Sequence, residues 1–242
     1  MSNTLIIIPV RMDSKRFPGK PLVKIRNKTM LEHVIDRAKE SKVGKVIVAC
    51  CDKEITELLD NIKTDYIMTK KNLESGTDRV SEAFKRIKNK KKYDFIINLQ
   101  GDIPFINHKY ILKLKELIKQ SPPCIASLVS EIKEKRKIND PNVVKAVLSK
   151  YEKNSYRAIY FSRSPVPYNS EKYYEHIGIY AYSRNSLQKF VNFEKSLLEK
   201  NESLEQLRAL DNHMKILVGK VKESPISIDT RENLISLNKK ER

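Results

Sequence analysis

Short apolar runs alternate with amphipathic segments through the first half of this chain. The apolar runs have the length and the β-branched content of buried strands, and they lie at residues 5–9, 45–51, 66–68 and 93–99. Between and after them, apolar residues recur at helical spacing in segments near Met30, Ile55, Val80 and Ile111. Dense strand–helix alternation predicts an α/β fold with a mostly parallel central sheet and helices on both faces.

The pattern changes from Cys124 onward, where strand-like segments are separated by turns rather than by long helices. The expected strands are residues 125–129, 143–148, 157–161, 176–182, 216–218 and 226–228, and the expected helices are 186–193, 197–210 and a last one from Arg231. No linker is long enough to separate independent domains. We therefore predict one domain over residues 1–242, with halves of about 1–122 and 123–242.

Composition limits the classes of protein that this chain can form. Hydrophobic residues make up 40% and charged residues 32%, as in globular proteins. The apolar run at residues 5–10 is too short for a signal peptide, and no run approaches the ~20 apolar residues of a membrane span. Cys50, Cys51 and Cys124 fit neither a disulfide framework nor a zinc site. We expect reduced thiols in a cytoplasmic protein with no membrane partner.

The net charge of +18 requires an anionic partner to be considered. Nucleic acid, an anionic membrane surface and small anionic substrates would all fit it. Most basic residues are lysines spread along the chain, and no aromatic residues interleave with the dense run at residues 85–92. We therefore expect a solvated helix end at 85–92 and no nucleic-acid partner, and nucleic-acid binding is kept as a remote alternative.

The loop after the first strand is the strongest candidate for chemistry. It contains Arg11, Ser14, Arg16 and Lys20 within ten residues, which suits a polyphosphate. Neither the Gly-rich phosphate loop nor the dinucleotide fingerprint is present. Since ligands of parallel α/β sheets bind at the carboxyl ends of strands, the loops after the third and fourth strands should lie beside this one.

Those two loops carry further polar groups. The first contains Ser75, Gly76, Thr77 and Arg79, where Thr77 could equally be a helix N-cap. The second places Asp102 just beyond a strand, where its oxygens could bind Mg²⁺. Asp229, expected at the end of a late strand, is the best candidate for a second carboxylate. Its local pattern alone favours an N-cap of the last helix.

These segments resemble the 3-deoxy-manno-octulosonate cytidylyltransferase (CMP-Kdo synthetase) family, and the resemblance covers residues 6 to about 237. The matching segments, in family order, are 7–11 (IIPVR) with 19–22 (GKPL), 75–79 (SGTDR), 98–102 (NLQGD), 140–145 (DPNVVK), 160–163 (YFSR), 176–180 (HIGIY), 204–208 (LEQLR) and 228–230 (IDT). Any one of them is weak, but the ordered set is specific. The resemblance implies a nucleotide-diphosphosugar-transferase-like fold, usually a homodimer, whose second half binds the sugar acid and dimerises.

The resemblance also implies a reaction and a set of roles. CMP would pass from CTP to the anomeric hydroxyl of 3-deoxy-manno-octulosonate (Kdo), giving CMP-Kdo and pyrophosphate for lipopolysaccharide biosynthesis. The implied roles are catalytic residues Arg16, Lys20 and Asp102; nucleotide-binding residues Arg11, Ser14, Arg16, Lys20, Ser75, Gly76, Thr77 and Arg79; sugar-acid residues Gln100, His176, Tyr180, Glu205 and Gln206; and Mg²⁺ ligands Asp102 and Asp229.

Two positions depart from the family pattern. Leu73 stands where a histidine is common, and Ile103 stands where a glutamate commonly follows the metal aspartate. Both replace a polar group near the expected site, which leaves 8-amino-Kdo or a nine-carbon nonulosonate open as the substrate. A catalytically inactive relative is disfavoured because Lys20, Asp102 and Asp229 are all present.

Overall fold

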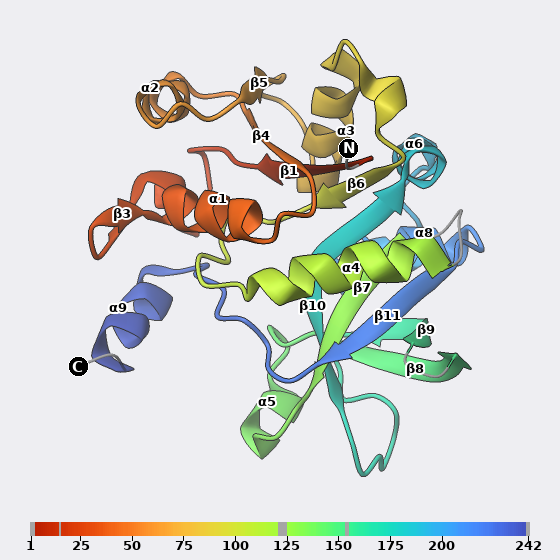
Figure 1. Cartoon of the computed structure of the whole chain (residues 1–242). Coiled ribbons are helices and arrows are strands. Elements are labelled where there is room, and N and C mark those ends of the chain that lie inside the picture. Colours follow the sequence, from red (N-terminus) through yellow and green to blue (C-terminus); the bar gives the residue numbers. More distant parts are fainter. Residues whose placement is uncertain (1–2, 15, 121–124, 153–154, 241–242) are drawn as a thin grey trace. The chain divides into compact units, whose positions relative to one another are not determined.

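The computed structural model describes residues 3–14, 16–120, 125–152 and 155–240 (Figure 1). Lys15, in the cation-rich loop of residues 11–20 that follows the first strand (the cationic loop), and Cys124 lie outside the described residues. The chain divides into two compact units, one of residues 1–111 with 225–242 and one of residues 112–224. The C-terminal residues thus belong to the same unit as the cationic loop. The extent of a single domain over 1–242 stays a prediction.

The first unit is built on parallel strands. Their order is β5 (Tyr66–Met68), β4 (Lys45–Cys50), β1 (Thr4–Pro9) and β6 (Phe95–Asn98), and every pairing is parallel. Every residue of β1 is buried, as expected for a strand covered on both faces. This arrangement confirms the predicted α/β class and places three strand ends beside one another at the sheet's carboxyl edge.

Helices α1 (Met30–Glu40), α2 (Lys53–Asn61) and α3 (Gly76–Arg86) connect these strands. Figure 1 shows α1 and α3 on opposite sides of β1, the arrangement that crossover connections to either side of a central strand produce. Short elements complete the unit: η1 (Lys20–Leu22), the hairpin β2 (Lys24–Ile25) and β3 (Lys28–Thr29), and η2 (Lys90–Lys92). Thr29 and Glu32 form a capping box that starts α1.

The chain's last segment packs within the first unit. Ile228 and Leu237, the latter in α9 (Arg231–Lys240), share a buried apolar cluster with Phe17, Ile25 and Met30. The predicted strand at 226–228 is wrong, because these residues form no strand and belong to the segment between β11 and α9. The backbone N–H of Ile228 donates to the carbonyl oxygen of Asp102 at 2.9 Å.

The second unit has a mixed sheet. Its strand order is β10 (Tyr174–Ser183), β7 (Ile125–Glu131), β11 (Ile216–Val221), β9 (Ser155–Ser162) and β8 (Lys145–Glu152). Among the described residues of these strands, β7 and β11 pair in parallel, whereas β10 with β7, β10 with β8, β11 with β9 and β8 with β9 pair antiparallel. In the β10–β7 pair the register shifts between Ile177 and Ala181, which leaves residues 178–180 as a bulge opposite β7.

Helix α4 (His108–Gln120) contains the boundary between the units, and the second unit also holds α5 (Lys135–Asn139) and α6 (Arg184–Asn192). The prediction of one continuous helix over residues 197–210 is wrong. The segment is divided into α7 (Leu197–Glu202) and α8 (Leu207–Asp211), because Ser203 adopts a left-handed φ of 52° that ends α7. The helical spacing in the sequence thus continues across a point where the backbone helix ends.

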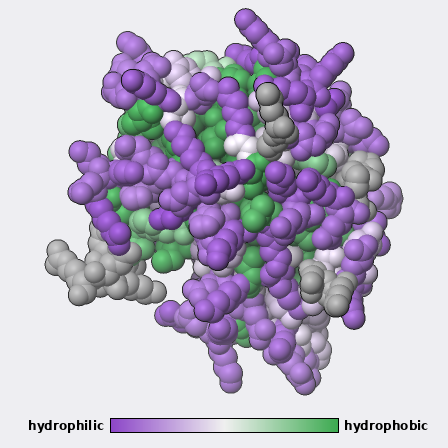
Figure 2. Space-filling model, viewed as in Figure 1, coloured by the Kyte–Doolittle hydropathy of each residue, from purple (hydrophilic) through white to green (hydrophobic). Residues whose placement is uncertain are grey.

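Hydrophilic side chains cover most of the face shown in Figure 2. The lysines of the 85–92 run are exposed; Lys85 lies in the last turn of α3 and Lys90–Lys92 form η2. The run is therefore solvated, as expected, although only its first residues belong to the helix end. Among the described residues, no helix has both the length and the apolar content needed to cross a membrane.

Candidate active site

A cavity of about 340 Å³ lies at the carboxyl edge of the first unit's sheet. It is lined by the loops that follow β1, β5 and β6 and by the segment before α9. Of the residues assigned above to nucleotide or metal binding, those lining the cavity are Arg11, Ser14, Arg16, Lys20, Ser75, Gly76, Arg79, Asp102 and Asp229. The structure therefore brings together the loops that the sequence placed at the carboxyl ends of neighbouring strands.

Two glycines allow these loops their close approach. Gly19 has a φ of +74°, which side-chain-bearing residues rarely adopt, and its N–H donates to the Met12 carbonyl at 2.9 Å to close the cationic loop. At Gly101, an added Cβ would lie 2.5 Å from Cγ1 of Val10 and 3.3 Å from the backbone oxygen of Pro9. The loop after β6 can therefore lie against the end of β1 only with glycine at this position.

The N-terminus of α3 borders the cavity. Ser75 Oγ accepts from the Asp78 N–H at 3.0 Å, and the Asp78 carboxylate accepts from the Ser75 N–H at 3.1 Å, which is a capping box. The cap is thus Ser75, and the alternative that Thr77 caps this helix is wrong. Thr77 is 1% exposed and accepts a hydrogen bond from the Asn98 amide at 3.2 Å. It does not line the cavity, and its contact with a nucleotide stays a prediction.

Arg79 lines the cavity, but its guanidinium donates hydrogen bonds to groups of the protein itself. Nη1 donates to Thr69 Oγ1 at 2.5 Å and to the Lys70 carbonyl at 3.2 Å, and Nη2 donates to the Lys71 carbonyl at 3.5 Å. The side chain is 2% exposed. These hydrogen bonds connect the segment after β5 to α3. Arg79 could therefore act on a nucleotide only while it also holds this segment in place.

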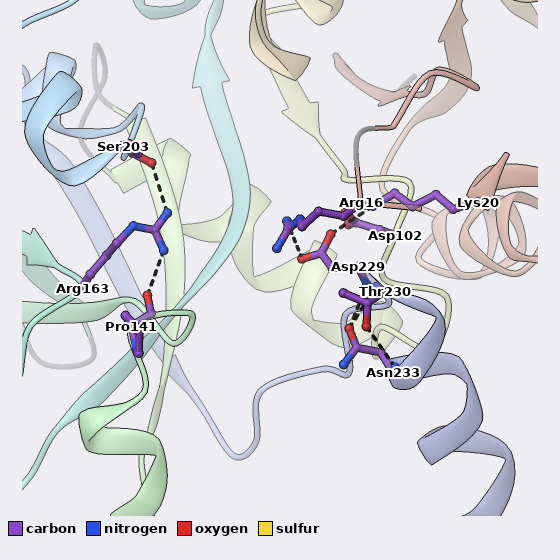
Figure 3. A network of polar contacts seen from close by, with 9 residues as sticks. All are labelled: Arg16, Lys20, Asp102, Pro141, Arg163, Ser203, Asp229, Thr230 and Asn233. Carbon is purple, nitrogen blue, oxygen red and sulfur yellow. Dashed lines mark hydrogen bonds and ion pairs between the residues drawn. The ribbon is translucent and has the colours of Figure 1, made fainter. Parts of the chain in front are cut away.

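Two carboxylates converge on one cation. Lys20 Nζ lies 2.8 Å from Asp102 Oδ2 and 3.1 Å from Asp229 Oδ1, and Arg16 Nη2 lies 3.2 Å from Asp229 Oδ2 (Figure 3). Burial by itself lowers the pKa of Lys20, but the attraction of Asp102 and then of Asp229 outweighs it and raises that pKa above 10.5. Burial raises the pKa of Asp102, against the opposing effect of Lys20, and nearby Asp229 raises it further.

The side chain of Asp229 does not cap the last helix, which is the role that its local sequence pattern favoured. Thr230 Oγ1 accepts from the Asn233 N–H at 3.3 Å, and Asn233 Oδ1 accepts from the N–H groups of Asp229 and Thr230 at 3.2 and 3.1 Å (Figure 3). Thr230 and Asn233 therefore cap α9 reciprocally. The Asp229 carboxylate points instead to Arg16 and Lys20, which leaves it able to bind a ligand.

The carboxylates of Asp102 and Asp229 suit a divalent cation. They already hold the ammonium of Lys20 between them, and hard oxygen donors are the ligands that Mg²⁺ prefers. In the part of the chain that the structure describes, no group of three or more His, Cys, Asp or Glu side chains could hold a metal. A metal here would need water or a bound phosphate as its other ligands, which is the usual environment of Mg²⁺.

The second unit holds a separate polar cluster at the β10 bulge. His176 Nε2 lies 2.9 Å from Ser127 Oγ, and the Tyr180 hydroxyl donates to Gln206 Oε1 at 3.3 Å. The amide nitrogen of Gln206 lies 3.5 Å from His176 Nδ1. Burial lowers the pKa of His176 to about 3, and burial followed by the charge of Glu205 raises the pKa of Tyr180. Four of the residues assigned to the sugar acid thus belong to one cluster.

Gln100, the fifth residue of that set, lies in the first unit and lines its cavity. Its amide nitrogen donates to Asn98 Oδ1 at 3.0 Å, and Asn98, fully buried, also donates to Thr77. Sequence reasoning missed Asn98 as an organiser of this edge. An amide at the last position of an otherwise apolar strand is the signal that could have identified it.

The two departures from the family pattern have different surroundings. Leu73 is partly exposed and lines the cavity, so a substitution there changes the surface that a ligand meets. Ile103 is 5% exposed and does not line the cavity. The direction expected from alternation, with Ile103 turned away from the face that carries Asp102, agrees with this burial.

The cations and carboxylates at the carboxyl edge of this parallel α/β unit suit the transfer of a nucleotide, and the chain is a nucleotidyltransferase. The cytidylyltransferase family model matches residues 5–216. The chain is 40% identical over 235 residues to the 3-deoxy-manno-octulosonate cytidylyltransferase of Bartonella bacilliformis, with 97% of each chain covered, and 42% identical over 246 residues to that of Thermodesulfovibrio yellowstonii, covering 96% of this chain and 95% of the relative. The chain belongs to the 3-deoxy-manno-octulosonate cytidylyltransferase family.

Solved structures agree with this assignment. A CMP:2-keto-3-deoxy-manno-octonic acid synthetase complexed with CTP aligns over 100% of both chains, with a TM-score of 0.89 and 35% identity. A UDP-glucose pyrophosphorylase complexed with UDP-glucose aligns over the same extent with a TM-score of 0.71 at 13% identity, which shows the shared fold alone. The nucleotide-diphosphosugar-transferase-like fold expected from the sequence is therefore confirmed.

Proposed function

We propose that this enzyme transfers CMP from CTP to the anomeric hydroxyl of Kdo, forming CMP-Kdo and pyrophosphate. The observation that carries the proposal is the convergence of Asp102 and Asp229 on Lys20, beside Arg16, in the first unit's cavity. The relatives named above for this activity, and the solved synthetase complexed with CTP, support both substrates.

In the proposed reaction, the anomeric oxygen forms a bond to the α-phosphorus of CTP. The bond from that phosphorus to the bridging oxygen of the β-phosphate breaks, pyrophosphate leaves, and the hydroxyl proton passes to solvent. Both reactants are anions, so catalysis depends on offsetting their repulsion and the charge that develops. Arg16 and Lys20 supply cations for the triphosphate, and no covalent enzyme intermediate is required.

Asp102 and Asp229 would hold Mg²⁺. When bound there, the metal ion would supply Lewis acidity and so favour ionisation of the attacking hydroxyl. The protein's own contribution begins from an arrangement in which Lys20 and Arg16 neutralise these carboxylates. With a metal ion held by the two carboxylates, Lys20 and Arg16 would be available to the phosphates of CTP.

The cluster of His176, Tyr180, Glu205 and Gln206 is proposed to bind the sugar acid. His176, Tyr180 and Gln206 offer neutral acceptors and donors on a buried framework, which is what recognition of several sugar hydroxyls needs. Leu73 at the cavity leaves a different acid, 8-amino-Kdo or a nonulosonate, as the alternative substrate. A homodimer, a cytoplasmic location and a role in lipopolysaccharide biosynthesis remain predictions of the family resemblance.

Pyrophosphate release tests the reaction. Purified enzyme is incubated with CTP and Mg²⁺ and with a panel of Kdo, 8-amino-Kdo and a nonulosonate, each with and without EDTA. Release with Kdo that EDTA abolishes is the expected result, and UTP in place of CTP is the matched nucleotide control. Release that is faster with another acid would transfer the proposal to that acid. The absence of CTP-dependent release with every acid would overturn it.

A further inference from the structure

A buried hydroxyl lies behind the histidine of the second unit's polar cluster. Ser127, in β7, is fully buried and faces the β10 bulge, between the register pairs Leu128–Ile177 and Ala126–Ala181. Its Oγ lies 3.2 Å from the Ile177 carbonyl oxygen and 2.9 Å from the Ile179 carbonyl oxygen. The bulge withdraws these carbonyls from the regular ladder, so the hydroxyl provides a hydrogen bond that β7 backbone does not supply.

The same oxygen contacts the ring of His176. Ser127 Oγ has one hydrogen, and two carbonyl oxygens, which can only accept, lie within hydrogen-bond distance of it, so we assign that hydrogen to a carbonyl oxygen. The 2.9 Å contact between Oγ and His176 Nε2 is then a hydrogen bond in which Nε2–H donates. A neutral imidazole carries one N–H, so Nδ1 is left as an acceptor.

Gln206 agrees with this assignment. Its Oε1 accepts from the Tyr180 hydroxyl at 3.3 Å, so its NH₂ group is the one that faces His176 Nδ1, at 3.5 Å. That distance is at the outer limit of a hydrogen bond, which leaves the Nδ1 lone pair only weakly engaged. The ring itself is held between Phe161 and Tyr180, with centroids 4.7 and 5.5 Å away.

We propose that Ser127 is a positioning residue for sugar-acid recognition: it fixes His176 as the Nε2–H tautomer and so presents Nδ1 as an acceptor for a hydroxyl group of the substrate. This inference rests on the proposed sugar-acid role of His176. A neutral acceptor attracts a hydroxyl donor and repels a carboxylate. His176 therefore reads a hydroxyl position on the sugar, and the substrate's carboxylate must be bound by other groups.

The tautomer can be measured without any substrate. Protein labelled with [¹⁵N]histidine is examined by long-range ¹H–¹⁵N correlation at neutral pH, and His176→Gln identifies the signals of His176 among the four histidines. The Nε2–H pattern is expected in the unaltered enzyme. An Nδ1–H or a charged ring would overturn the proposal, whether or not any variant folds.

Ser127→Ala then tests the role of the hydroxyl. Without an acceptor at Nε2 the ring should populate both tautomers, and KM for the sugar acid should rise about five-fold, as for loss of one hydrogen bond, while KM for CTP stays unchanged. Ser127→Thr keeps the hydroxyl and should restore both readouts. Ser130→Ala, in the same strand and also buried, is the matched control and should alter neither.

The outcomes separate this inference from the proposed function. An unchanged tautomer in Ser127→Ala, or a changed tautomer with unchanged sugar-acid KM, overturns the positioning role. If the unaltered enzyme turns over no sugar acid, the proposed function and the substrate part of this inference both fail, and the tautomer measurement still decides whether Ser127 orients the ring.

Discussion

The ammonium of Lys20 lies 2.8 Å from the carboxylate of Asp102 and at the same time 3.1 Å from that of Asp229. A lysine from the loop after β1 thus neutralises carboxylates that come from residues 82 and 209 positions away in sequence. The position that Lys20 occupies is the one for which a divalent cation would compete.

Replacing this lysine should make the protein dependent on a metal for stability. In Lys20→Met the two carboxylates lose their shared cation, and the free energy of unfolding in EDTA should fall by about 2 kcal/mol. Added Mg²⁺ should restore most of that loss and should stabilise the unaltered protein less, which thermal unfolding with and without Mg²⁺ would measure. Lys24→Met, at an exposed lysine in β2, is the control. A stability loss that Mg²⁺ leaves unchanged would argue against a metal site at these carboxylates.

Asp229 and Thr230 are neighbours with separable roles. Asp229→Asn should lower turnover about 10²-fold because a charge at the reacting phosphate is lost, and its melting temperature should change little. Thr230→Ala removes the helix cap and should cost about 1 kcal/mol of stability with turnover nearly intact. Asp102→Asn should resemble Asp229→Asn. Kinetics and melting of all three variants decide the matter, and a destabilised but fully active Asp229→Asn would reduce Asp229 to a structural residue.

The two departures from the family pattern should respond differently to a polar side chain. Leu73→His places the imidazole at a partly exposed cavity wall, so stability should change little. Ile103→Glu buries a carboxyl group at a position that is 5% exposed, and should destabilise by about 3 kcal/mol. Turnover with Kdo of folded Ile103→Glu should change less than about 10-fold. Urea unfolding and kinetics test both, and a large gain of Kdo turnover in Ile103→Glu would indicate another natural substrate.

Stability should fall with acidification because of His176. Burial lowers its pKa from 6.5 to about 3 in the folded protein. Between these values the unfolded chain binds a proton that the folded protein does not, so the stabilisation present above pH 6.5 is lost as the pH falls. His176→Gln should lose about 2 kcal/mol less than the unaltered protein between pH 7 and pH 5. His213→Asn, at an exposed histidine, is the control for urea unfolding at the two pH values. Equal losses in His176→Gln and the unaltered protein would contradict the buried neutral ring.

Much of the fold could be predicted from sequence because its signals are local. The strand at Tyr66–Met68 follows from a short apolar run, and the apolar stripe of α1 follows from helical spacing. The interruption at Ser203 and the absence of a strand at 226–228 could not be predicted, because a left-handed φ at a serine and the path of an apolar segment outside the sheet leave no mark in local sequence. Residues 226–228 have the apolar pattern of a strand, but the side chain of Ile228 packs instead in the buried cluster around Phe17.

The candidate site, like the fold, could be predicted from the sequence only in part. Strand-end reasoning placed Arg16, Lys20 and Asp102 on one edge, since the carboxyl ends of parallel strands meet there. The ion pairs that join them to Asp229 required the structure, as did the cap formed by Thr230 and Asn233. Ser127 carried no signal at all, because a serine in an apolar strand is ordinary until the bulge opposite it is known.

The transfer reaction itself is tested most directly by ³¹P NMR of CTP, Kdo and Mg²⁺ with the enzyme. The account predicts that the three CTP resonances are replaced by pyrophosphate and one phosphodiester resonance in equal molar amounts, and only when Kdo is present. Formation of CMP and pyrophosphate without Kdo, or CTP that persists unchanged beside Kdo, would contradict it.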